Sequence, residues 1–315
     1  MSQLWVTNSL GGHLTNNSLS KSLRKQALPS YVYRQFVNIK EDMGKKVGDT
    51  VFFDKRLRID TKGGTLTETA TIPENKWKVV KDSVVVTEVG NSVPYTEKLD
   101  TLAEFDASDI SSQVLLEDQL EVIDSLAYDQ FNSAEYIAVC SDTATTVFTT
   151  NGTATVTASA SASDKNIRDI VDYMKKRAIP KFADGNYRAI VSVNTRRGVY
   201  DFLQPIAAYA EPSYRHTSEV GMYYNVRFAE DNAFASDSIG LNSNKGSGFV
   251  FGQESVLEAV ALPEEIRMKI PTDFGRSKGV AWYGIMAWKK MWSLASDDLN
   301  ATLKGIERIV KITSA

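Results

Sequence analysis

The chain has 315 residues, 43% of them hydrophobic, with 36 basic and 39 acidic side chains and a formal net charge of −3. This size allows one large or two ordinary domains, and so weak a charge excludes a whole-chain attraction to nucleic acid or to a membrane surface. The single cysteine, Cys140, excludes an intrachain disulfide. The sequence contains no apolar run of about 18 residues and no signal-peptide pattern at its start, so we expect no membrane segment and no leader.

Charge is unevenly distributed along the chain. Residues 1–60 hold ten basic and five acidic side chains, whereas residues 97–142 hold twelve acidic side chains and Lys98 as their single base. Two separately solvated surfaces are the usual meaning of such a pattern. Alternatively, the basic segment lies on the acidic one, within a chain or between chains.

The first 30 residues are rich in Ser, Asn and Leu and are typical of an arm rather than of a core element. Residues 29–46 then predict a short amphipathic helix with Tyr33, Phe36 and Val37 along one face. Strands begin after this helix.

Residues 49–90 predict an extended β arm. Alternation over about ten residues places Val51, Phe53, Leu57 and Ile59 on one face, and a second β-branched strand covers 76–90. Between the strands stands Lys62-Gly63-Gly64-Thr65, a composition also found in phosphate-binding loops. It lacks the G-x-x-x-x-G-K-[ST] order and a following helix, so a turn at the tip of the arm is favoured.

Residues 95–151 contain no glycine and no proline, which permits a long helix capped by Asp106 or Ser108. Its length over about 27 residues would be roughly 40 Å. The spacing predicts one apolar stripe, made of Leu116, Leu120, Ile123, Ala127, Phe131 and Ala134. The predicted solvated faces carry Glu117, Asp118, Glu121, Asp124 and Asp129.

The second half of the chain predicts a hairpin and then a compact α/β region. Asn151-Gly152 within 147–164 is a two-residue hairpin signal. The further expected elements are a helix over 164–180, a buried strand over 187–193, a helix over 194–203 begun by Asn194, a turn into a strand over 218–232, a strand and then a short helix or turn over 248–262, and a final strand over 306–315.

The chain contains no recognisable catalytic motif. A Cys140–His216 pair is formally possible, but Cys140 has apolar neighbours, which favours an inert thiol. The acidic residues of 117–124 spread around the predicted helix and are expected to be solvated rather than to bind a cation. Trp282, Trp288 and Trp292 are core residues in one interpretation and a base-stacking platform in another. We expect no catalytic residue, no cofactor and no metal site.

The order of elements resembles the major capsid protein of tailed bacteriophages, with its Hong Kong 97 type fold, and most of all the N-four-like podophage group. The segments that carry this resemblance are FVNIKEDMGKKVGDTVFFDK leading to GGTLTET, DIVDYMKKRAIPKFADGNYRAIVSVNTRRGVYDFL, EVGMYYNVRFAEDN, and GVAWYGIMAWKKMW followed by IERI. They cover roughly residues 30–315, and their order is more specific than any one of them. The Ser/Thr/Ala-rich segment 141–163 departs from the pattern.

The resemblance implies an α+β capsid fold in five parts. These are an N-terminal arm (1–48), an extended loop formed by a β-hairpin (49–98), a peripheral domain with the spine helix and a hairpin (99–164), an axial domain (165–265), and C-terminal strands that return to the peripheral domain (266–315).

The implied function is a coat protein that self-assembles into the hexamers and pentamers of an icosahedral shell around double-stranded DNA, in the virion capsid, after assembly in the host cytoplasm. The implied partners are other copies of the chain, scaffolding, portal and decoration proteins, and packaged DNA in weak non-specific contact, with no membrane. Candidate intersubunit contacts are Arg56, Arg58, Lys62, Gly63, Gly64, Glu117, Asp118, Glu121 and Asp124.

Two other functions stay open from the sequence. One is a β-rich phage tail or surface-adhesion protein, which would form trimers and no closed shell. The other is a carboxylate-dependent hydrolase with an acidic pair among residues 117–124, which would require a concave pocket around these carboxylates.

Overall fold

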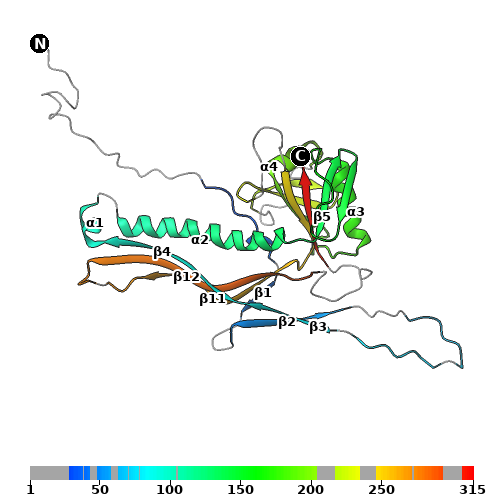
Figure 1. Cartoon of the computed structure of the whole chain (residues 1–315), viewed down its shortest axis with the longest axis horizontal. Helices are drawn as coiled ribbons and strands as arrows, with labels where there is room; N and C mark the ends of the chain where they lie inside the picture. The colour runs from blue at the N-terminus through cyan, green and yellow to red at the C-terminus, as the bar shows by residue number, and fades with distance from the viewer. Residues whose placement is uncertain are drawn as a thin grey trace, which may run out of the picture.

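The computed structural model describes residues 28–37, 39–42, 48–57, 63–69, 71–77, 79–103, 106–203, 217–234, 246–271, 273–293 and 307–315. The molecule has a long lobe and a compact lobe (Figure 1). In the long lobe, one long helix lies along a four-stranded sheet. The compact lobe stands at one end of this helix and is built on a seven-stranded sheet. A separate two-stranded hairpin lies below the long lobe and points past the compact lobe.

The long lobe contains the helices α1 (Glu97–Leu102) and α2 (Ala107–Asn132) and a sheet with the strand order β1-β11-β12-β4. Its strands are β1 (Ile39–Asp42), β4 (Thr87–Thr96), β11 (Val256–Met268) and β12 (Ser277–Lys290). Only β1 and β11 are parallel in this sheet. The helix packs on the sheet through Leu115, which meets Val280 and Trp282 of β12 in one buried cluster.

Helix α2 lies within residues 95–151, the segment that contains no glycine and no proline. Asp106 caps its start by accepting hydrogen bonds from the backbone N–H groups of Ser108 and Asp109, which are otherwise unpaired at a helix N-terminus. Its 26 residues give a length of about 39 Å at 1.5 Å per residue. The predicted helix and its cap at Asp106 are therefore confirmed.

The predicted apolar stripe of α2 is only partly correct. Ile123, Ala127 and Phe131 are buried as expected, but Leu116 and Leu120 are exposed, and Leu115 takes the inward position instead. The buried face of this long helix thus contains Leu115 rather than Leu116. The predicted solvated face is also wrong at Asp124, which is buried.

The compact lobe has a sheet with the strand order β6-β5-β13-β10-β7-β9-β8, and its described residues include the helices α3 and α4. Helix α3 (Asp164–Lys176) starts with a capping box between Ser163 and Asn166 and buries Ile167, Ile170, Val171 and Met174, as predicted. The remaining elements are β5 (Tyr136–Asp142), β6 (Thr145–Thr149), β7 (Tyr187–Ser192), α4 (Val193–Arg197), β8 (Glu219–Tyr223), β9 (Val226–Asp231), β10 (Gly246–Phe251) and β13 (Ile309–Ser314).

Several predicted elements of this region differ from the structure. The hairpin is formed by β5 and β6, and Asn151-Gly152 lies beyond it, because the N–H of Gly152 donates to the carbonyl of Glu135 rather than closing a two-residue turn. The predicted helix 194–203 is short α4, capped by Ser192, followed by the 3-10 turn Tyr200–Phe202. Over 248–262, where a strand and then a short helix or turn is expected, the structure has β10, a short bend and the start of β11.

The predicted helix over 29–46 is also wrong. It is a 3-10 turn over Arg34–Phe36 followed by β1, which pairs with β11. The aromatic residues of this segment serve the core where the two lobes meet. There, Tyr33 and Phe36 pack with Phe131 of α2 and with Phe249 and Phe251 of β10.

The hairpin of β2 (Thr50–Arg56) and β3 (Val79–Val85) is antiparallel, with Thr50 opposite Val85 and Arg56 opposite Val79. The single strand expected over 76–90 is interrupted at Val86, so β3 and β4 belong to different sheets. On the inner face of β2, Phe53 is buried as expected and Lys55 is buried beside it, whereas Leu57 is half-buried. The predicted inward position of Ile59 lies outside the described residues.

The five-part domain division stays a prediction. In the structure, β5, β6 and β13 share one sheet with β7, β9 and β10. The described part of the chain contains no helix long and apolar enough to cross a membrane.

Candidate assembly surfaces

The four candidate acids of α2 lie in different environments. Asp118 is half-buried and accepts hydrogen bonds from Nε1 of Trp282 at 2.7 Å and from Nδ2 of Asn91 at 3.1 Å. These two donors belong to β12 and β4. Asp118 therefore fastens the helix to its own sheet.

Asp124 is occupied inside the chain as well. Its two oxygens accept from the backbone N–H groups of Val32 at 2.9 Å and of Arg34 at 2.8 Å. Burial raises the pKa of Asp124 to about 6 against the lowering effect of these donors, and the charge of Asp231 also raises it. Asp124 holds the N-terminal segment on α2, and a neighbouring molecule does not have free access to it.

Glu117 and Glu121 remain on the outside of the helix. Glu117 is half-buried, and exposed Glu121 accepts a hydrogen bond from the Tyr31 hydroxyl at 3.3 Å. Exposed Leu116 and Leu120 lie beside them on the same turns. We call Leu116, Glu117, Leu120 and Glu121 the outer stripe of α2, a surface both acidic and apolar.

The base of the β2–β3 hairpin is fixed to the long lobe. Phe53, Val84 and Val86 form a buried cluster with Leu257, Ala259 and Ala287 of the sheet. Beside it, Asp82 is paired with Lys55 at 2.9 Å and with Lys289 of β12. Burial alone would raise the pKa of Asp82, but hydrogen bonds from Lys289 and Lys55 hold it below its ordinary value. The hairpin base is therefore an integral part of the chain.

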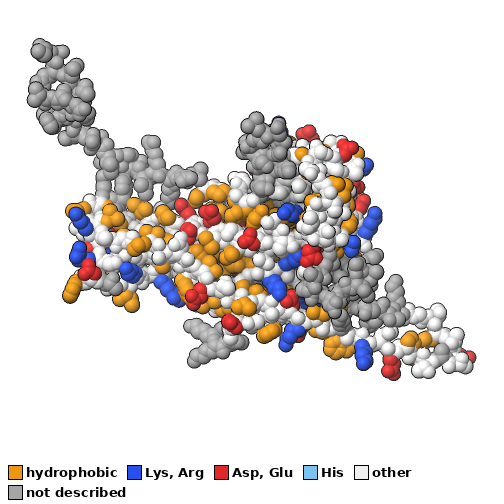
Figure 2. Space-filling view, in the orientation of Figure 1, with side chains coloured by type: hydrophobic (Ala, Val, Ile, Leu, Met, Phe, Trp, Pro, Cys, Tyr) orange, Lys and Arg blue, Asp and Glu red, His pale blue; other side chains and the backbone are white. Residues whose placement is uncertain are grey.

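Beyond its base, the described part of the hairpin is exposed. Arg56, at the end of β2, is exposed, and Gly63 and Gly64 have open space around them. Arg58 and Lys62 lie outside the described residues. In the distal loop (63–69 and 71–77), every side chain is exposed, including Leu66 at 53%, Ile72 at 67% and Trp77 at 74%. In the space-filling view this loop extends from the body at the lower right, with hydrophobic atoms uncovered (Figure 2).

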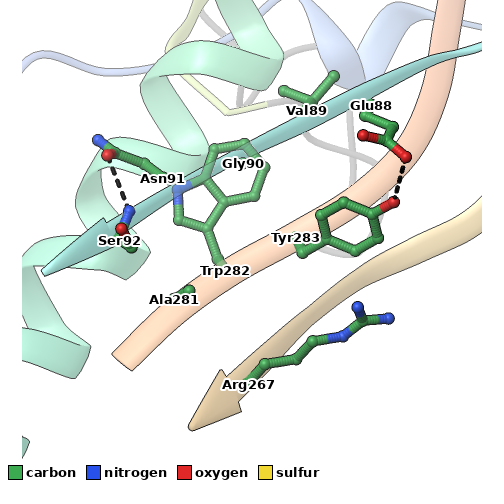
Figure 3. A pocket seen from close by; sticks show the side chains of 9 residues that line it. All are labelled: Glu88, Val89, Gly90, Asn91, Ser92, Arg267, Ala281, Trp282 and Tyr283. Carbon is green, nitrogen blue, oxygen red and sulfur yellow. Dashed lines mark hydrogen bonds between the residues drawn. The ribbon is translucent and has the colours of Figure 1, made fainter. Parts of the chain in front are cut away.

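A shallow open hollow of about 540 Å³ lies on the sheet of the long lobe, between β4, β11 and β12 (Figure 3). Within it the Tyr283 hydroxyl donates to Glu88 at 2.9 Å, and the Arg267 guanidinium lies 4.4 Å from the centre of the Tyr283 ring. The carboxylates of residues 117–124 do not line this hollow. This hollow is therefore not the carboxylate pocket that the hydrolase interpretation requires.

The sequence-level candidates for reactive chemistry are Cys140, the histidines and a metal-binding cluster. Burial raises the pKa of the Cys140 thiol to about 12, which keeps it protonated and unreactive. No group of three His, Cys, Asp or Glu side chains lies close enough to hold a metal ion among the described residues. His13 and His216 lie outside these residues. Buried Trp282, which donates to Asp118, and Trp288 are core residues rather than a stacking platform.

Sequence reasoning missed Arg34 as a structural centre. Its guanidinium donates to buried Glu258 at 2.8 Å and to Glu264 at 2.6 Å, so it ties the N-terminal segment to β11. These partners stand 224 and 230 positions away along the chain. No local pattern signals such a pair, because it depends on which strands meet.

Comparison with known proteins gives a clear result for the fold. No protein-family model and no curated protein matches the sequence. Solved structures do match. The capsid of Ralstonia phage GP4 has a TM-score of 0.70 at 17% identity, with 98% of this chain and 97% of that chain covered. The head structure of Helicobacter pylori bacteriophage KHP40 gives 0.65 at 11% identity over 96% and 95%. The capsid structure of cyanophage P-SCSP1u gives 0.64 at 7% identity over 96% and 94%.

These matches extend over nearly the whole of both chains in each pair. The chain therefore has the fold of phage capsid proteins, which confirms the fold class expected from the order of its elements. The closer likeness to the N-four-like podophage group stays a prediction.

Proposed function

We propose that this chain is the major capsid protein of a tailed bacteriophage, which self-assembles into hexamers and pentamers of an icosahedral shell around double-stranded DNA. The observation that carries the proposal is a capsid fold matched from end to end, combined with a hairpin whose distal loop exposes apolar side chains. On this proposal the chain is a structural component of the virion and not an enzyme.

The shape of the molecule supports an assembly role. Leu66, Ile72 and Trp77 remain largely exposed in their own fold, on a loop that extends past the compact lobe. Burying a large apolar side chain stabilises by roughly 1.5–3 kcal/mol. That gain is available only when the loop lies on another molecule, and a closed shell repeats it at each equivalent contact.

Charge suggests where the base of the loop lies. Exposed Arg56 and the neighbouring Arg58 carry positive charge, and the outer stripe of α2 presents Glu117 and Glu121. We place Arg56 and Arg58, which we call the loop base, and the N-terminal arm of one subunit near the outer stripe of another. Lys62, Gly63 and Gly64 remain contact candidates on the loop, whereas Asp118 and Asp124 have partners within the chain.

The proposal includes weak, non-specific contact with packaged DNA, because a net charge of −3 avoids a strongly basic inner wall that would hold the DNA. Scaffolding, portal and decoration proteins are the further partners expected of such a shell.

Electron microscopy and light scattering of the purified chain test this function. The expected result is closed shells, or rings of five and six copies. Stable trimers without shells would favour a tail or adhesin protein instead. A monodisperse monomer at high concentration, also in the presence of co-expressed scaffold and portal proteins, would overturn the proposal.

A further inference from the structure

Three segments from both lobes meet at a buried cluster of two carboxylates and one ammonium group. Glu307 leads into β13 of the compact lobe, Lys290 ends β12 of the long lobe, and Glu135 joins α2 to β5. The side chain of Glu307 is fully buried. Figure 1 shows that these elements come together where the two lobes adjoin.

The hydrogen bonds of this cluster converge on one oxygen of Glu307. Its Oε1 accepts from the backbone N–H of Glu135 at 2.9 Å and from Nζ of Lys290 at 3.1 Å. Lys290 also donates to the carbonyl of Ser133 at 2.9 Å and to Oε1 of Glu135 at 3.3 Å. One ammonium group thus joins the end of α2 to the start of β13.

The second oxygen of Glu307 has no such donor. Among the described residues, Oε2 is buried without a hydrogen-bond partner. An ionised carboxylate with one oxygen removed from water and unpaired is costly, whereas a protonated carboxyl group has no full charge to solvate. The geometry therefore suits the neutral acid better than the anion.

Other charged groups near the cluster are engaged elsewhere. Arg177, at the end of α3, lies over the rings of Tyr136 and Tyr173. Arg308 pairs with Glu254, and Lys311 donates to Asn132. Within the described part of the chain, Lys290 is the cation that contacts Glu307, and it is shared with Glu135. Glu135 also accepts a hydrogen bond from the Ser293 hydroxyl at 2.6 Å.

We propose that Glu135, Lys290 and Glu307 form a proton-controlled joint between the two lobes, which tightens when Glu307 takes up a proton and loosens when it loses one. This inference concerns the single chain and holds whether or not the chain assembles into shells.

The titration of Glu307 sets the pH window of the joint. Burial raises the pKa of Glu307 from its ordinary 4.5 to about 7, and the charge of Glu135 adds to this, whereas Lys290 and the Glu135 N–H lower it. Because the folded pKa lies above the ordinary value, protonation favours the closed joint. Its contribution is complete at acid pH and is lost as the pH rises through about 7.

Hydrogen exchange at the backbone N–H of Glu135, which donates to Glu307, reports directly on the joint in the full-length protein. After correction for the intrinsic exchange rate, the local opening constant should fall about tenfold between pH 8 and pH 6, as linkage predicts for such a pKa. The test variant is Glu307→Gln, which keeps the shape and the accepting oxygen but cannot ionise. Its opening constant should change less than about twofold over the same range.

Glu265→Gln is the matched control, because Glu265 pairs with Arg267 at an exposed site and should leave the pH response of Glu135 intact. Asp124, the other described carboxylate with a raised pKa, is present in every protein compared and therefore cancels. A flat response in the unmodified chain would overturn the inference, even if Glu307→Gln does not fold. So would a tenfold response that persists in Glu307→Gln. Failure to form shells would contradict the proposed function and leave this result unaffected.

Discussion

At the scale of single residues, identical carboxylates of one helix have different roles. Asp124 accepts hydrogen bonds from two backbone N–H groups of the N-terminal segment, whereas Glu121, one turn earlier, accepts one from the Tyr31 hydroxyl at an exposed site. The sequence predicts acids on the outer faces of α2. It does not indicate that a segment some 90 positions earlier covers one of them. A helical pattern shows which residues share a face, but not what lies on that face.

Replacing Asp124 with alanine should therefore destabilise the fold. Two buried N–H groups lose their acceptor, so the free energy of unfolding should fall by about 2–4 kcal/mol. Asp124→Asn keeps one accepting oxygen and should lose less. Urea denaturation of unassembled protein measures both effects. Glu121→Ala is the control and should change the free energy by less than about 0.5 kcal/mol. Equal losses for Asp124→Ala and Glu121→Ala would contradict this role.

At the scale of elements, helices and buried strands were predictable where local signals agree. Helix α3 has its cap, apolar face and proline stop within residues 163–180, and β7 is a short buried strand with the apolar centre Ala189-Ile190-Val191. The signals failed where tertiary contacts overrule them. Asn151-Gly152 has the composition of a hairpin turn, but Gly152 is bonded to Glu135. Residues 29–46 have a helical pattern, but Arg34 and Tyr33 are held by distant strands.

The distal loop of the β2–β3 hairpin carries apolar side chains that the monomer leaves exposed. Replacing Leu66, Ile72 and Trp77 together with serine removes apolar surface that is already solvated. The melting temperature of unassembled protein should change by less than about 2 °C. The yield of shells, counted by electron microscopy, should fall strongly because each copy loses that burial at its contact.

The matched control for this triple variant is Thr65→Ser, Thr67→Ser and Thr71→Ser, which alters the same loop without touching its apolar groups. Its shell yield should equal that of the parent. If the serine variant of Leu66, Ile72 and Trp77 forms normal shells, or if its monomer is clearly destabilised, the loop does not have the proposed role.

At the scale of the whole molecule, the sequence predicted the order of the elements but not the sheets they form. Strand β1 pairs with β11 and strand β5 with β13, across more than half of the chain. Such pairs leave no local trace in one sequence. The order of elements was enough to predict a capsid fold, and the structural matches confirm that fold at identities between 7% and 17%. The intersubunit contacts of individual residues stay predictions, because they depend on molecules outside the chain.

The charged contact between subunits is the most direct of these predictions. Reversing Arg56 and Arg58 to glutamate should leave the monomer folded, because Arg56 is exposed at the end of β2. The reversal replaces an attractive contact with a repulsive one, at a cost of about 1–2 kcal/mol of contact free energy per subunit. The yield of shells should therefore fall by about tenfold or more. Arg56→Lys with Arg58→Lys keeps the charge and should assemble normally.

A charge exchange identifies the partner surface of Arg56 and Arg58. Glu117→Arg with Glu121→Arg should impair assembly alone, and mixing this protein with the Arg56→Glu, Arg58→Glu protein should restore attraction at half of the contacts. The recovered shells should contain both variants, which mass spectrometry of purified particles measures. Because exposed ion pairs are screened by salt, the rescue should weaken as ionic strength rises. If the mixture yields no more shells than either variant alone, the loop base lies on a surface other than the outer stripe of α2.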